Sequence, residues 1–111
     1  MTDPQELLAA ERRRTAERLL LLRADHAEVV EASRDTNADD EHDPEGQTIA
    51  YERSQVATLV RQAERHLDEV DAALVRVDDG TWGLCESCGA RLPVGRLEAR
   101  PTARTCVGCA G

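Results

Sequence analysis

Mostly apolar positions recur along the first third of the chain at alternating steps of three and four. After one gap of seven, the stripe comprises Leu8, Thr15, Leu19, Leu22, His26, Val29 and Ser33. Such a heptad-like stripe is typical of a helix that packs against a second helix. Asp3 can cap the free amides at the start, and Pro4 suits the first helical position. We therefore predict a helix from Pro4 to about residue 34.

A second stripe of matching length follows after residue 48. It comprises Ile49, Val56, Val60, Ala63, Leu67, Val70, Leu74 and Val77. Gly80 can take the left-handed conformation of a helix C-cap. Between the stripes, residues 35–46 read DTNADDEHDPEG, and their Asn, Asp-Pro and Gly favour a loop. Residues 1–80 are therefore expected to fold as an antiparallel two-helix coiled-coil hairpin, which makes the fold class mainly α.

The last 31 residues, 81–111, hold all four cysteines in the pattern Cys85-x-x-Cys88 and Cys106-x-x-Cys109. Seventeen residues separate the two pairs. Two such pairs supply the tetrahedral, all-sulfur shell of one structural zinc ion and leave no position for a catalytic water. The alternatives are a redox pair, which would need a βαβ context, or two disulfides. We predict a C-terminal zinc-finger module over residues 81–111.

The charge balance limits the classes of partner. The chain has a formal net charge of −8, and all 14 of its basic residues are arginines. This acidic balance argues against direct DNA binding, which needs clustered positive charge, and it favours a basic protein partner. The N-terminal segment has no apolar run that would serve as a signal peptide or a membrane span, so a cytoplasmic protein is expected. We also find no Ser-His-Asp order, phosphate-binding glycine loop or open metal position, so no enzyme is predicted.

The connecting loop of residues 35–46 is strongly acidic. It carries six carboxylates within eleven residues and no basic residue among them. The simplest interpretation is a solvated turn, for which Asp, Asn, Pro and Gly are ordinary choices. The functional interpretation is a negative tip that meets Mg²⁺ or basic side chains of a partner.

The segment GTWGLCESCGARLPVGRLEARPTARTCVGCA, together with the hairpin and its acidic loop, resembles the DksA/TraR family of bacterial transcription regulators. The resemblance implies direct binding to RNA polymerase, with the coiled-coil tip inserted through the secondary channel toward the catalytic Mg²⁺. It also implies an effect on transcription initiation, in some members jointly with guanosine tetraphosphate. The residues that would face the polymerase are Asp39, Asp40, Glu41, Asp43 and Glu45.

The tip departs from the family motif Asp-x-x-Asp-x-Ala. If Asp43 is the first Asp, the second falls on Gly46 and the Ala on Thr48; the offset match Asp40-x-x-Asp43 has Glu45 in place of Ala. Binding to polymerase is therefore better supported than regulation of the DksA kind. The sequence stops two residues after Cys109, so contacts that longer members make through a further C-terminal helix, including any share in nucleotide binding, are not assumed.

Basic residues outnumber acidic ones between the cysteines. The arginines are Arg91, Arg96, Arg100 and Arg104. The default interpretation is that they form a solvated surface, and the alternative is that they contact polymerase or a nucleotide phosphate. Trp82, three residues before the first cysteine, is expected to pack between finger and hairpin. The competing function is a zinc-containing adaptor whose hairpin binds another protein.

Overall fold

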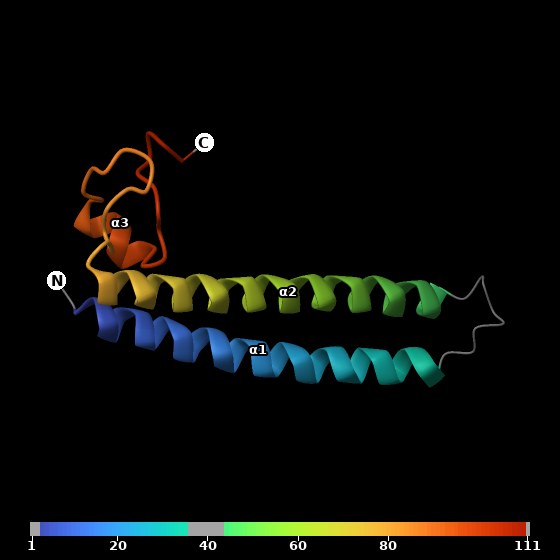
Figure 1. Ribbon diagram of the computed structural model, residues 1–111. Coiled ribbons are helices and arrows are strands. Elements are labelled where there is room, and N and C mark those ends of the chain that lie inside the picture. The colour runs from blue at the N-terminus through green and yellow to red at the C-terminus, as the bar shows by residue number, and fades with distance from the viewer. Residues whose placement is uncertain (1–2, 36–43, 111) are drawn as a thin grey trace. The chain divides into compact units, whose positions relative to one another are not determined.

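The computed structural model describes residues 3–35 and 44–110. They form three helices, α1 (Pro4–Asp35), α2 (Pro44–Asp79) and α3 (Val94–Ala99). Figure 1 shows α1 and α2 as two long helices side by side with opposite directions, and α3 within the C-terminal segment. The described part holds no strand, only one antiparallel bridge between Leu84 and Arg91. The predicted mainly α fold, with a two-helix hairpin, is confirmed.

None of the described helices is apolar over a stretch long enough to cross a bilayer.

The start of α1 lies where the sequence predicts it. The backbone N–H of Gln5 donates to the Asp3 side chain at 3.4 Å, and the N–H of Leu7 donates to the Asp3 carbonyl at 2.9 Å. These bonds satisfy amides that a helix N-terminus otherwise leaves without partners. Pro4 then occupies the first helical position without losing a bond.

The predicted loop over residues 35–46 is too long at both ends. Asp35 still belongs to α1, and α2 begins at Pro44, so Pro44 and Gly46 are helical. Proline lacks only an N–H that the first turn of a helix does not use, so Asp-Pro here starts a helix. The glycine that follows lies in the first turn, where its low helix propensity is tolerated.

The end of α2 has the C-cap that the sequence predicts. Gly80 has φ of 83°, and the N–H groups of Thr81 and Trp82 both donate to the carbonyl of Arg76, at 2.9 and 3.1 Å. This capping satisfies carbonyls of the last turn and reverses the chain direction. The finger segment therefore leaves α2 in a defined direction.

The described residues form two compact units. The first, which we call the base unit, comprises residues 3–14 and 66–110; the second, the middle unit, consists of the described residues of Thr15–Arg65. In the base unit, Leu8 of α1 is buried against Val70 and Ala73 of α2. Leu74, Val77 and Trp82 pack around this cluster. Ala73 lies beside the predicted stripe because a helix of 3.6 residues per turn buries a face wider than one row.

Polar contacts in the base unit also join the two helices. Arg12 Nε donates to Asp71 at 2.9 Å, and His66 Nε2 lies 2.8 Å from Glu11 Oε1. Glu11 pairs with Arg14 as well. Partial burial would raise the pKa of Glu11, but the hydrogen bonds with His66 and Arg14 outweigh it and hold that pKa below its usual value.

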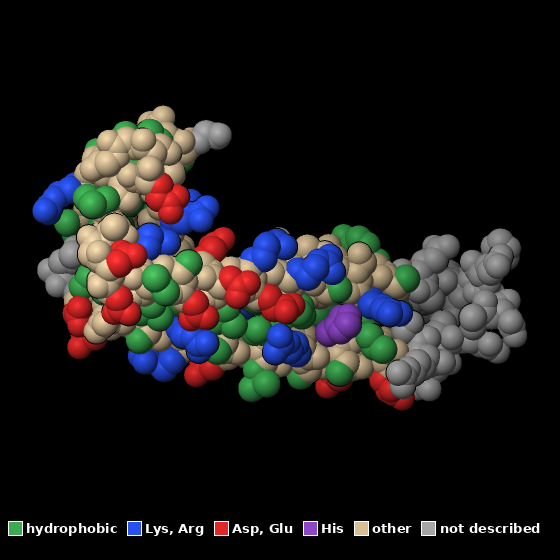
Figure 2. All heavy atoms as spheres, viewed as in Figure 1, with side chains coloured by type: hydrophobic (Ala, Val, Ile, Leu, Met, Phe, Trp, Pro, Cys, Tyr) green, Lys and Arg blue, Asp and Glu red, His purple; other side chains and the backbone are tan. Residues whose placement is uncertain are grey.

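The middle unit has a thinner core. Its buried side chains are Thr15 and Leu19 on α1 and Ala63 on α2. The other described stripe positions are only half-buried: Leu22, His26, Val29, Ile49, Val56 and Val60. Arg23 and Glu64 form an exposed ion pair at 3.6 Å between the helices. Figure 2 shows acidic and basic side chains interspersed along α1 and α2 on the face in view.

Candidate metal centre

Backbone hydrogen bonds arrange the first cysteine pair. The N–H of Cys85 donates to the Ala90 carbonyl at 2.8 Å, and the N–H of Gly89 donates back to the Cys85 carbonyl at 2.9 Å. Gly89 has φ of 75°, a left-handed conformation that residues with a side chain rarely adopt. The result is a tight turn that directs Cys85 and Cys88 to the same side.

The second pair lies on a similar turn. The N–H groups of Cys109 and Ala110 donate to the Cys106 carbonyl at 3.0 and 2.9 Å. One further bond, from the N–H of Glu86 to the carbonyl of Arg104 at 2.9 Å, ties the two turns together. Residues far apart in sequence thus meet at one point.

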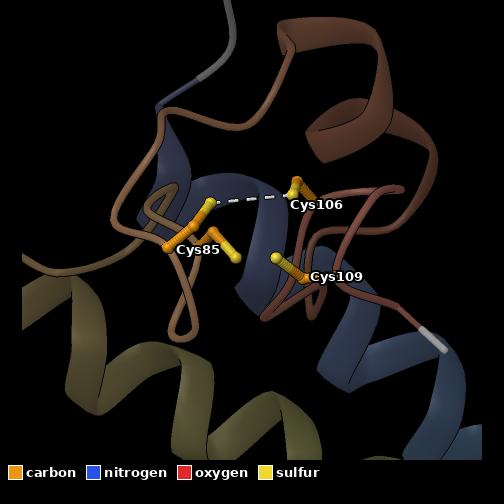
Figure 3. Close-up of side chains that lie close together, drawn as sticks. Cys85, Cys106 and Cys109 are labelled. Atoms are coloured by element: carbon orange, nitrogen blue, oxygen red, sulfur yellow. Dashed lines mark hydrogen bonds between the residues drawn. The ribbon is translucent and has the colours of Figure 1, made fainter.

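The four sulfur atoms lie within 4.8 Å of one another, and Cys88 Sγ is 3.8 Å from Cys106 Sγ. Figure 3 shows the side chains of Cys85, Cys106 and Cys109 directed toward a common centre. A tetrahedral zinc ion with bonds of about 2.3 Å requires sulfurs about 3.8 Å apart. All four cysteines are free thiols. The group therefore fits one structural zinc ion, and none of these four cysteines forms a disulfide.

The electrostatics of the thiols favour a cation. Backbone hydrogen bonds, first that of Cys106 and then that of Cys88, lower the pKa of Cys85 to about 6. Side-chain hydrogen bonds with Cys106, Cys85 and Cys88 raise the pKa of Cys109 to about 12. Four neighbouring thiols cannot all ionise beside one another without a positive charge, and a divalent ion supplies that charge.

A small apolar cluster supports the centre. Cys85, Leu92 and Leu97 are buried together, and Leu97 is brought there by α3. Trp82 packs against this cluster and also against the Leu8, Val70 and Ala73 cluster. Its indole N–H donates to the Pro101 carbonyl at 2.9 Å. The prediction that Trp82 anchors the finger to the hairpin is confirmed.

The four arginines of the finger differ in their surroundings. Arg96 Nε donates to the Thr105 carbonyl at 3.1 Å, and Arg104 Nε lies 3.8 Å from a Glu86 oxygen. Arg91 and Arg100 are exposed and make no side-chain hydrogen bond or ion pair within residues 3–35 and 44–110. Arg96 thus holds the finger together, whereas Arg91 and Arg100 are available to a partner.

The predicted tip residues lie outside the described residues or at their edge. Asp39, Asp40, Glu41 and Asp43 lie outside the described residues, and Glu45 falls in the first turn of α2 with its side chain undescribed. Their role stays a prediction.

Comparison with known proteins points to one family. The family model of the prokaryotic dksA/traR C4-type zinc finger matches residues 80–111. The chain is 38% identical over 68 residues to the RNA polymerase-binding transcription factor DksA of Escherichia coli, which covers 60% of this chain and 45% of DksA. It is also 38% identical over 69 residues to the uncharacterized protein YteA of Bacillus subtilis, covering 62% of this chain and 29% of YteA. The matches thus span less than half the length of these relatives.

A solved structure has the same fold. The transcription factor DksA2 from Pseudomonas aeruginosa superposes with a TM-score of 0.78 at 24% sequence identity, over 95% of this chain and 75% of the other. The matched finger contains all four cysteines, and the helices that carry it follow the same arrangement. Residues 80–111 therefore match the C4-type zinc finger of the prokaryotic dksA/traR family, and the chain shares the fold of DksA2.

Proposed function

We propose that this protein is a non-enzymatic regulator that binds RNA polymerase directly in the bacterial cytoplasm and modulates transcription initiation. The observation that carries the proposal is the 38% identity over 68 residues to a protein named as an RNA polymerase-binding transcription factor. The clustered cysteines and the long helices supply the parts that such a role requires.

The acidic segment between α1 and α2 is the proposed effector. Helices of 32 and 36 residues flank it, long enough to reach into a channel. We propose that it enters the secondary channel of the polymerase, where its carboxylates meet Mg²⁺ or basic side chains. The residues concerned are Asp39, Asp40, Glu41, Asp43 and Glu45.

The base unit is the proposed docking part. Its zinc ion holds the fold and takes no part in chemistry, because four protein sulfurs fill the coordination shell. Where guanosine tetraphosphate acts jointly with the polymerase, the exposed Arg91 and Arg100 are the finger groups suited to its phosphates. Direct DNA binding is not expected, since the net charge is −8.

The test measures two properties of the zinc-loaded protein, its affinity for core RNA polymerase and its effect on initiation in a purified transcription assay. We expect the double variant Asp40→Asn, Asp43→Asn to bind within about threefold of wild type, because tip contacts add little to a docked complex. Its effect on initiation is expected to be lost. The matched control is Asp68→Asn, the same change at an exposed position of α2, which should alter neither property.

The second candidate is an adaptor that binds another protein. It is favoured by Gly46 and Thr48, which stand where the family motif has Asp and Ala. If the wild-type protein does not bind polymerase while its zinc content and helicity are intact, the regulator proposal is wrong and the adaptor takes its place.

A further inference from the structure

A groove of about 400 Å³ lies on the base unit, beside the metal centre. It lies between the start of α1, the end of α2 and the finger. Its lining includes Trp82, Leu84, Arg91, Leu92, Val94 and Leu97. Apart from Arg91, every side chain in this set is apolar.

The groove has a buried floor and exposed walls. Leu92 and Leu97 are 5% and 4% exposed, and they belong to the cluster that supports the cysteines. Leu84 and Val94 are 38% and 52% exposed. The floor therefore serves the fold, whereas the walls leave apolar surface in water that a partner could bury.

The groove is preformed. The bridge between Leu84 and Arg91 and the bond from Leu92 N–H to the Gly83 carbonyl at 2.8 Å fix one wall. Trp82 is fixed by its indole bond to Pro101. Gly83 has φ of 87°, and a Cβ there would lie 3.5 Å from Leu97 Cδ1, so the backbone itself packs on the floor. A ligand entering such a site costs little ordering of the protein.

The charge at the groove selects its occupant. Arg91 is exposed, and within the described residues its guanidinium has no hydrogen bond or ion pair. Nearby arginines are engaged: Arg96 binds the Thr105 carbonyl, and Arg76 donates to the Thr102 carbonyl at 3.4 Å. A free guanidinium beside an apolar groove suits a carboxylate next to a bulky apolar side chain, since the carboxylate can take two parallel hydrogen bonds.

We propose that this groove is a docking site for a surface segment of RNA polymerase that presents an apolar side chain beside an acidic one. The apolar side chain lies between Leu84 and Val94, and the acidic one pairs with Arg91. This inference rests on the proposed function and adds to it the face by which the base unit holds the polymerase.

The experiment compares two groove variants with two matched controls. Val94→Asp places a charge in the groove, and Val107→Asp makes the same change at a residue that is 73% exposed and does not line it. Arg91→Glu reverses the charge of the groove, and Arg13→Glu reverses an exposed charge on α1 that does not line it. Each zinc-loaded protein is titrated against core RNA polymerase without added nucleotide, after its zinc content and helicity are shown to equal those of wild type.

We expect the groove variants to bind at least about tenfold more weakly and the controls to stay within about twofold. The loss in Arg91→Glu should shrink as salt is raised, because ions screen the charge, whereas the loss in Val94→Asp should persist. If all four variants bind polymerase as tightly as wild type, the docking site is wrong and the proposed function still holds. Failure of wild type to bind overturns the proposed function and this inference with it. If the wild-type chain instead self-associates and Val94→Asp abolishes that self-association, the occupant is a second copy and the proposal is wrong.

Discussion

The two compact units obtain their stability in different ways. The base unit combines two apolar clusters with a four-sulfur metal centre, and Trp82 packs against both clusters. The middle unit relies on a single line of contacts, in which Leu19 is the one large apolar side chain that is buried among the described residues. Two of its leucines, Leu20 and Leu21, are 71% and 68% exposed. The buried contacts that hold side chains in one arrangement are thus concentrated in the base unit.

This difference indicates how such a small acidic chain can present a long hairpin. Two helices alone bury only one face each, which rarely stabilises a fold. The metal centre and its supporting cluster add a third element at one end of the helices. We therefore expect changes in the base unit to cost more than equivalent changes in the middle unit.

The largest effect on the base unit is expected from removing the metal. We expect a strong chelator, or Cys85→Ser, to unfold residues 81–110, because structural zinc contributes about 10–16 kcal/mol in finger peptides. Most far-ultraviolet helical signal should remain, since α3 has six residues and α1 and α2 have 32 and 36. The measurement is the amide dispersion of the finger by NMR, with Ser87→Ala as the control that keeps all ligands. A finger that stays folded without metal would contradict the structural role.

Truncating one core residue in each unit sharpens the comparison. We expect Leu8→Ala in the base unit to lower the free energy of unfolding by about 2–5 kcal/mol, because Leu8 is fully buried. Leu22→Ala in the middle unit should cost less than half as much, since Leu22 is half-buried. Urea unfolding measures both, and Leu20→Ala, at an exposed position, should change stability by less than about 0.5 kcal/mol. Equal losses at Leu8 and Leu22 would remove the distinction between the units.

The junction between α2 and the finger gives a smaller effect. Gly80→Ala should cost about 1 kcal/mol, because Gly80 has φ of 83° while an added Cβ would meet nothing within 4 Å. Gly95→Ala is the matched control: Gly95 lies in α3 without a positive φ, and an added Cβ again meets nothing within 4 Å. That substitution should be neutral or slightly stabilising. Thermal melting of both variants measures the contrast, and equal shifts would mean that the backbone conformation at Gly80 carries no strain.

The smallest effect concerns pH and Glu11. Its pKa is lowered in the folded protein, so its contribution to stability is present above about pH 4.5 and is lost as pH falls through the folded pKa. We expect the stability difference between wild type and Glu11→Gln, in excess zinc, to be below about 1 kcal/mol at pH 6 and to narrow toward pH 4. Glu17→Gln, at an exposed position of α1, is the control. A difference that grows as pH falls would have the wrong sign for this contact.

Local patterns predicted much of this fold. The stripe of apolar positions identified both long helices, Asp3 and Gly80 marked a helix start and end, and the two C-x-x-C pairs identified the residues of the metal centre. The helix signals succeed because each depends on residues within a turn or two of one another. The two C-x-x-C pairs succeed for another reason, because one metal shell needs sulfurs from both pairs.

Features that depend on distant residues were missed. The contact of His66 with Glu11 joins residues 55 positions apart, and no spacing rule points to it. The division among the arginines was also missed, because only the folded chain shows that Arg96 reaches the Thr105 carbonyl while Arg91 has no side-chain partner among the described residues. The loop before α2 was assigned too long because Asp-Pro serves both as a turn signal and as a helix start.

The position of Trp82 gives the protein an optical reporter of its own. It is the chain's one tryptophan, and its indole packs on both apolar clusters of the base unit. Its N–H is bonded to the Pro101 carbonyl, which lies beyond the first cysteine pair. Loss of the metal would break that hydrogen bond, whereas separation of α1 from α2 would expose the other side of the ring to water. Intrinsic fluorescence therefore follows two separate events, and two successive red shifts during unfolding would reveal the order in which finger and helices come apart.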